Sequence, residues 1–214
     1  MGQEDIAGLY VVAAAGTDTG VLAAVLEAAR PATVLVAAAK DGEALTAAAA
    51  RPLVELVQGK GIAALIEGDA QLARTLRADG VHLPWDKDIE ARYGEAREIL
   101  GTRYIIGVDV GRSRHDAMVL AEEGADYIAF GIPSHVEDRE TAAERRFELV
   151  TWWSEIFEVP CVAFDVENLA DAEALAAAGA DFVAIARNDT FSADDYANLA
   201  RAIVAASSKR EALA

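Results

Sequence analysis

A short pattern recurs along this chain where a helical stretch gives way to an apolar one. The fullest copy, GADYIAFG, occupies residues 124–131, and a near copy, AGADFVAIA, occupies residues 178–186. A weaker copy, ADGVHL, lies at residues 78–83. Recurrence of one junction indicates a repeated structural unit, and this unit joins a helix to a strand. The chain is therefore predicted to alternate strands and helices.

Eight short apolar runs are the expected strands, and eight segments of helical period lie between and after them. The runs are nearly continuous in apolar residues, which is typical of parallel strands buried on both faces. They are residues 9–13, 33–38, 62–66, 80–83, 104–108, 127–130, 161–164 and 182–185. The expected helices are residues 17–30, 43–58, 71–78, 89–100, 113–123, 141–157, 168–178 and 193–206, with Pro52 expected to kink or break the second.

This alternation predicts an α/β fold, a (β/α)8 barrel, with residues 1–214 forming one domain. A doubly wound open sheet is the alternative. That fold normally carries a glycine-rich phosphate loop after its first strand, and here residues 13–17 hold only Gly16.

Composition excludes several classes of function. The formal net charge of −17 leaves no basic stripe for nucleic acid. No apolar segment reaches the length that spans a membrane, and no leader pattern is visible. The single cysteine, Cys161, lies in an apolar run and is expected to be buried rather than nucleophilic. We therefore expect a cytoplasmic protein without a nucleic-acid or membrane partner.

Barrels of this kind place their sites at the C-terminal ends of the strands, so the polar residues that follow each apolar run are the candidates. Carboxylates follow several runs and suit the hard oxygen coordination of Mg²⁺. Asp69 and Asp165 have an alternative role as helix caps, and His82 as a core histidine. The candidate metal ligands are Glu67, Asp69 and Asp86, and the candidate cations for phosphate are Lys40, Arg139 and Arg187.

Two other features have open interpretations. The aromatic residues Phe147, Trp152, Trp153 and Phe157 share an expected helix, where core packing and a subunit interface are both compatible with their spacing. Residues 132–140 form the longest polar connection, whose composition suits a mobile lid.

The order and spacing of the junctions resemble those of thiamine phosphate synthase and its sister, the thiazole tautomerase. The resemblance runs from about Thr33 to Asn188. It implies a (β/α)8 barrel and a transferase of thiamine biosynthesis. That enzyme joins a pyrimidine pyrophosphate to a thiazole phosphate with Mg²⁺ and releases pyrophosphate. The departure of the pyrophosphate is then assisted by cations.

The resemblance carries over residue by residue, with departures. Of the family's Gln-x-Arg-x-Lys after the second strand only Lys40 remains, as the candidate catalytic residue. The glycine pair that cradles phosphate after the seventh strand reads Asp165-Val166, and a carboxylate there would repel phosphate. The implied substrate- and phosphate-binding residues are Lys40, Asp109, Ser134, His135, Arg139, Asp165 and Arg187.

Three interpretations of the function remain open. The chain is a divergent synthase, a barrel that binds a different and less phosphorylated small molecule, or an inactive paralogue. The last would act through protein contacts on the helix that carries Trp152 and Trp153, as a homo-oligomer or with another protein. Because a fold does not carry a function by itself, the site has to decide between them.

Overall fold

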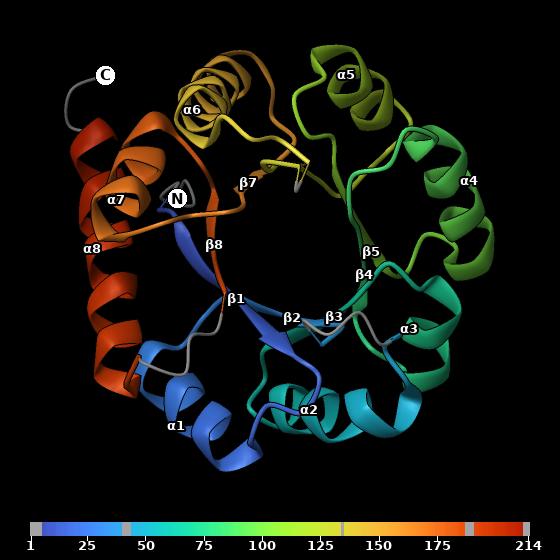
Figure 1. Cartoon of the computed structure of the whole chain (residues 1–214). Coiled ribbons are helices and arrows are strands. Elements are labelled where there is room, and N and C mark those ends of the chain that lie inside the picture. Colours follow the sequence, from blue (N-terminus) through green and yellow to red (C-terminus); the bar gives the residue numbers. More distant parts are fainter. Residues whose placement is uncertain (1–5, 40–43, 134, 187–190, 212–214) are drawn as a thin grey trace.

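The computed structural model describes residues 6–39, 44–133, 135–186 and 191–211. Eight parallel strands close into a barrel, and a helix follows each strand on the outside (Figure 1). The sheet closes because β8 (Phe182–Ala186) pairs with β1 (Gly8–Ala14), in a register that sets Leu9 opposite Val183. The predicted (β/α)8 barrel is confirmed, and the open sheet is wrong because this pairing leaves no edge strand.

The remaining elements follow in strict alternation. The other strands are β2 (Thr33–Ala37), β3 (Ala63–Glu67), β4 (Gly80–Leu83), β5 (Ile105–Asp109), β6 (Tyr127–Phe130) and β7 (Cys161–Ala163). The helices are α1 (Thr19–Ala29), α2 (Ala47–Gly59), α3 (Ala70–Leu76), α4 (Ile89–Leu100), α5 (Arg114–Glu122), α6 (Arg139–Ile156), α7 (Leu169–Ala178) and α8 (Ala193–Glu211). Each helix therefore starts at the rim where the preceding strand ends.

Short polar side chains fix where the helices begin. Asp18, Asp69 and Asn168 each accept a backbone amide from the first turn of α1, α3 and α7. Asp138 does the same for α6, so that helix begins at Arg139, two residues before the expected start. The connection predicted as a lid is thereby shorter than residues 132–140. Helix α2 continues through Pro52, so the alternative of a break is wrong.

Hydrophobic side chains form two layers, one inside the barrel and one between the sheet and the helices. The outer layer includes Trp153, which is fully buried and donates its indole N–H to the carbonyl of Val159 at 2.7 Å. Trp153 also stacks on Phe157 with ring centroids 4.1 Å apart. Core packing therefore accounts for Trp153, whereas Phe147 on the same helix is 44% exposed. Cys161 is buried, as expected.

The inner layer contains a chain of buried hydrogen bonds across the barrel. The hydroxyl of Tyr127 lies 2.9 Å from Nδ1 of His82 and 3.1 Å from the hydroxyl of Tyr10. His82 also stacks on Phe164 with centroids 4.6 Å apart. Gly107 leaves room for this arrangement, because a β-carbon there would overlap the Tyr127 ring. Tyr10 and Tyr127 belong to the buried cluster inside the barrel, and Phe164 packs against that cluster.

None of the helices in the described ranges combines the length and apolar composition that crossing a bilayer demands.

Candidate functional site

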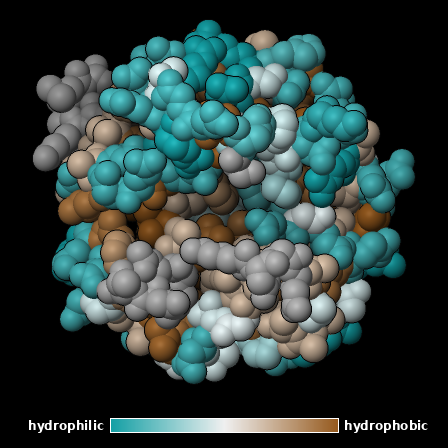
Figure 2. Space-filling view, in the orientation of Figure 1, coloured by the Kyte–Doolittle hydropathy of each residue, from teal (hydrophilic) through white to brown (hydrophobic). Residues whose placement is uncertain are grey.

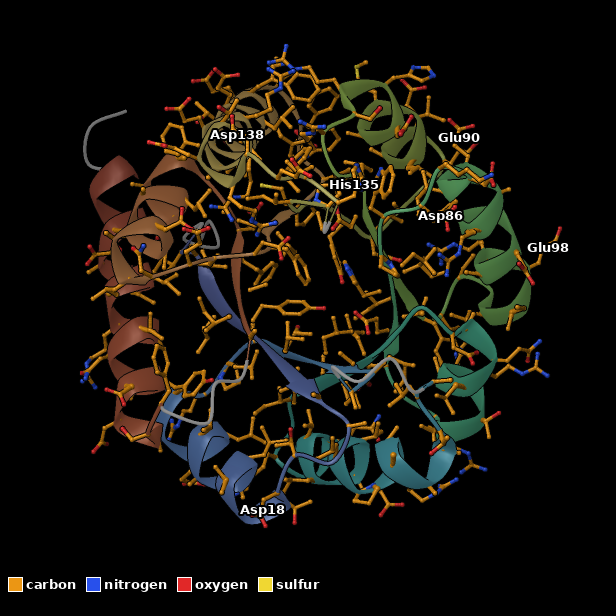
Figure 3. All side chains as sticks on the ribbon, in the orientation of Figure 1. Asp18, Asp86, Glu90, Glu98, His135 and Asp138 are labelled. Atoms are coloured by element: carbon orange, nitrogen blue, oxygen red, sulfur yellow. The ribbon has the colours of Figure 1, made fainter. Side chains whose placement is uncertain are left out.

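The C-terminal ends of the strands surround one mouth, and Figure 3 shows Asp86 and His135 among the side chains around it. Two carboxylates lie on either side of Gly131, which directly follows β6. A β-carbon on Gly131 would clash with Oδ2 of Asp109 and lie 3.0 Å from Oδ2 of Asp165. Only glycine fits at this position without moving a carboxylate. The structure therefore brings together two candidates from the ends of β5 and β7.

Backbone amides hold both carboxylates. Oδ1 of Asp109 accepts the amide of Gly111 at 2.7 Å and that of Gly131 at 3.3 Å. Oδ2 of Asp165 accepts the amide of Ile132 at 2.7 Å. Two successive amides after β6 thus bind the chain's own anions. Backbone N–H groups of this kind bind phosphate in other proteins.

The two carboxylates differ in their surroundings. The pKa of Asp109 is raised from 3.8 to about 7, chiefly by burial; the charge of Asp165 adds to the rise, and the hydrogen bonds from the two amides oppose it. Asp109 therefore exchanges a proton near neutral pH. Asp165 is exposed and has a φ of 57°, in the left-handed region that glycine favours and aspartate tolerates. It does not cap α7, a role that Asn168 fills.

Arg146, from the middle of α6, shapes the segment that carries Asp165. Its Nη1 donates to the carbonyls of Phe164 and Asp165 at 2.6 and 2.7 Å, and its Nη2 contacts both carboxylate oxygens of Asp171 at 2.7 Å. Arg146 is fully buried. Sequence reasoning missed it, although an arginine at helical spacing among Ala142, Leu149 and Trp153 was the signal.

Trp85 lies in the connection after β4, at the same end of the barrel as the two carboxylates. Its ring lies against Gly111, where φ is 56°, and its centroid is 5.2 Å from that of His135. Trp85 is 40% exposed and His135 is also exposed. Trp85 and His135, from two different connections, thus contact one another, and Trp85 also contacts Gly111, whose amide binds Asp109.

The candidate metal ligands lie in the connections after β3 and β4. Oε2 of Glu67 accepts the amide of Ala38 at 3.1 Å, and Oδ1 of Asp69 caps α3 at Leu72. Asp86 is more fully engaged: Oδ1 accepts the amide of Asp88, and Oδ2 pairs with Arg92 at 3.3 Å.

Arg92 also donates to the carbonyl of Gly68 at 3.3 Å and so connects the two segments. The backbone amide of Asp88 is the main cause of a lowered pKa at Asp86. Asp86 is therefore an anion that already has a cationic partner.

A family model for thiamine monophosphate synthase matches residues 9–188, which span the barrel from β1 to the end of β8. The chain belongs to the thiamine monophosphate synthase family. It is 41% identical over 138 residues to thiamine-phosphate synthase of Erythrobacter litoralis, covering 64% of this chain and 63% of that protein. It is 35% identical over 199 residues to that of an Azoarcus species, covering 90% and 93%.

The chain matches only about three-fifths of the length of the first three relatives, with 63%, 61% and 58% covered. Among solved structures, thiamine phosphate pyrophosphorylase from Pyrococcus furiosus superposes with a TM-score of 0.72 at 22% identity, covering 95% of this chain and 98% of that one. Tryptophan synthase from M. tuberculosis superposes at 0.69 with 14% identity. These likenesses show the barrel alone.

Within this thiamine monophosphate synthase family member, other candidates lie apart from the carboxylate pair. Arg139 belongs to the first turn of α6 and donates to the carbonyl of Ile132 at 3.3 Å. His82 is buried in the barrel, and burial lowers its pKa to about 3, so it is a neutral core histidine. Lys40, Ser134 and Arg187 lie outside the described residues.

Proposed function

We propose that this family member is a transferase of thiamine biosynthesis that joins a pyrimidine pyrophosphate to a thiazole phosphate and releases pyrophosphate. The observation that carries the proposal is the family match, which spans the strands and connections that form the mouth. The relatives at 35% and 41% identity are both named thiamine-phosphate synthase. A cytoplasmic location belongs to the same proposal and is tested by cell fractionation.

The charges around the mouth suit such a reaction. The leaving pyrophosphate takes the bonding electrons, so negative charge grows on it while positive charge grows on the pyrimidine methylene carbon. Cations stabilise the first charge, and Lys40, Arg139 and Arg187 are the proposed ones. The carboxylates of Asp109 and Asp165 lie at the ends of β5 and β7, where they would stabilise the second. Trp85 and His135 would limit the access of water.

Magnesium fits part of the candidate set. Glu67 and Asp69 each retain one carboxylate oxygen to which the described residues donate no hydrogen bond, whereas both oxygens of Asp86 are engaged. We therefore propose Glu67 and Asp69 as its ligands, whereas the carboxylate of Asp86 already forms an ion pair with Arg92. Bound there, the ion would supply positive charge to the leaving group.

The test is turnover by the purified protein with a pyrimidine pyrophosphate, a thiazole phosphate and Mg²⁺. Product formation supports the proposal, and its absence in a folded protein refutes it. Lys40→Ala should abolish turnover if Lys40 neutralises the leaving group.

The magnesium assignment has its own test, by calorimetry without substrates. Asp69→Asn keeps the cap of α3, because asparagine caps helices as well as aspartate does, and removes one metal ligand. We expect it to weaken Mg²⁺ binding about tenfold or more. Asp18→Asn, the same change at the cap of α1, is the matched control and should leave binding unchanged.

One observation favours a second candidate, in which the chain is an inactive paralogue that acts through protein contacts. Helix α6 exposes Phe147 at 44% and Ile156 at 61%, on the helix whose aromatic residues were expected in a core or an interface. Light scattering of the wild type and of Phe147→Ser tests it. A wild type that remains monomeric at high concentration argues against association of the chain with itself.

A further inference from the structure

Arg146 is a charged residue of α6 that lies wholly in the protein interior. The surface over α5 and α6 is mostly hydrophilic (Figure 2), and the neighbouring Arg145 stays there with 40% of its side chain exposed. Arg146 instead has an exposed fraction of 0% and extends to the connection that follows β7. A buried guanidinium requires hydrogen-bond acceptors for its N–H groups, and those acceptors show what this side chain holds in place.

Nη1 of Arg146 binds the two peptide groups on either side of the Asp165 α-carbon. It donates to the carbonyl of Phe164 at 2.6 Å and to that of Asp165 at 2.7 Å. Because the orientations of these two peptide planes define φ and ψ of Asp165, one nitrogen fixes the direction in which the aspartate side chain leaves the backbone. The φ is 57°, which is uncommon for residues other than glycine. In this conformation the carboxylate reaches the end of β6, where Oδ2 accepts the amide of Ile132 at 2.7 Å.

The other terminal nitrogen of Arg146 holds the first turn of α7. Nη2 contacts both carboxylate oxygens of Asp171 at 2.7 Å, and Oδ2 of Asp171 also accepts the amide of Glu167 at 3.1 Å. Asn168 accepts the amide of Asp171 at 3.0 Å and so caps the same turn. The connection from Phe164 to α7 is therefore folded around one buried cation.

Stability alone does not explain this arrangement, because three of its features are unfavourable. Nε of Arg146 is buried and finds no acceptor among the described residues, which leaves a desolvated donor unpaired. Asp165 adopts a positive φ. The ion pair with Asp171 takes a charge out of water, and hydrophobic residues often replace such pairs without loss of stability. Unfavourable features that coincide in one connection are typical of functional sites.

We propose that Arg146 is a positioning residue that fixes the Asp165 carboxylate beside Gly131 for the reaction at the mouth. The use of Asp165 in catalysis rests on the proposed function, whereas its placement by Arg146 does not. The charge of Asp165 is one cause of the raised pKa of Asp109, so that pKa depends on where the Asp165 carboxylate lies. Tyr127, on β6, also interacts with Asp109, but burial raises the pKa of Tyr127 and keeps it neutral. The pKa of Asp109 is therefore a measure of position that requires no turnover.

The experiment is a double-mutant cycle, read out as the pKa of the Asp109 carboxyl group by carbon-13 NMR on the full chain. Arg146→Lys keeps the charge but has one nitrogen in place of two, so it cannot hold both carbonyls and Asp171. Asp165→Asn keeps an acceptor for the Ile132 amide and tolerates a positive φ. Each single variant should lower the pKa of Asp109 by about one pH unit, and the double variant should lower it no further than Asp165→Asn. A wild-type pKa in folded Arg146→Lys overturns the inference, as do effects that add in the double variant.

A second variant and a control complete the cycle. Asp171→Glu keeps both charges but moves the carboxylate that orients Arg146, and it should lower the pKa of Asp109 in the same direction; a wild-type pKa there also contradicts the inference. Arg145→Lys alters an exposed pair one residue away and should change nothing.

Turnover separates the inference from the proposed function. In an active protein, Arg146→Lys should lower kcat about tenfold or more, with no further loss when Asp165→Asn is added. A wild-type kcat in Arg146→Lys overturns the positioning role. A wild type without turnover refutes the proposed function, and the pKa of Asp109 in the variants then decides the placement of Asp165 on its own.

Discussion

Replacing Asp109 by asparagine is expected to stabilise the protein at neutral and alkaline pH and to leave it unchanged in acid. Oδ1 of Asp109 accepts the amides of Gly111 and Gly131, and asparagine keeps an oxygen for both. What the variant loses is the negative charge. The comparison therefore isolates the cost of ionising a carboxyl group that is largely buried beside Asp165.

The direction of the pH dependence follows from the pKa of Asp109, which burial raises from 3.8 to about 7. Because the folded state holds the proton more tightly than the unfolded state, the raised pKa contributes stability that is fully present below pH 3.8. That contribution is lost as the pH rises through about 7. A shift of about three pH units corresponds to about 4 kcal/mol, at about 1.4 kcal/mol per unit. Water at the mouth reduces this, so we expect about 2 to 4 kcal/mol.

The assay is urea unfolding of both proteins, followed by circular dichroism at several pH values between about 4 and 8. Asp109→Asn should match the wild type at the acid end and exceed it by about 2 to 4 kcal/mol at the alkaline end. Asp138→Asn is the control: the amide of Thr141 lowers the pKa of this exposed cap, so its small effect should have the opposite sign. Parallel pH profiles for wild type and Asp109→Asn would refute the burial argument.

Three further predictions concern packing and buried polar groups, each measured by chemical denaturation. Gly80→Ala should lower the free energy of unfolding by more than about 3 kcal/mol, because the added methyl group overlaps a backbone carbonyl of β5. Gly94→Ala places its methyl group in open space on α4 and should be neutral or stabilising. Arg146→Met should lower the free energy of unfolding by about 3–5 kcal/mol, because it leaves the partly buried carboxylate of Asp171 without its cation. Arg145→Met removes only an exposed ion pair with Glu148, and its effect should be less than about 1 kcal/mol. Tyr127→Phe should cost about 1–3 kcal/mol, since two buried groups lose their shared partner, and unchanged stability would contradict that hydrogen-bond chain.

The sequence was sufficient to predict the barrel because local signals and the global pattern agree. Every strand was expected within a few residues of its observed position, since each apolar run is bounded by a turn or a capping residue. The start of α6 was expected at Thr141, two residues late, because the sequence pattern does not show that Asp138 accepts the amide of Thr141 and so caps a helix beginning at Arg139. Pro52 was expected to kink or break the second helix, but α2 continues through it, with Leu53, Val54 and Val57 packed in the core.

The site was less predictable, for a physical reason. Strand ends show which residues share the mouth, so Asp109 and Asp165 were found, but not that both flank Gly131. Asp69 was correctly recognised as a possible cap. Its second carboxylate oxygen could still bind a metal ion, so that role remains a proposal. Arg146 was invisible to a search of strand ends, because it reaches the site from the middle of a helix. Long side chains carry their charge far from their own backbone position.

The buried hydrogen bonds that link Tyr10, Tyr127 and His82 lie between two parts of the barrel that differ in their tolerance of substitution. Below them, glycine and aromatic residues fit one another so closely that few exchanges are tolerated. Above them, the mouth is built from the connections that follow the strands, of which the one after β7 sends Phe164 down onto His82. A connection residue whose side chain does not reach this interior can therefore be exchanged without unfolding the barrel, so ligand preference can change while the scaffold is kept.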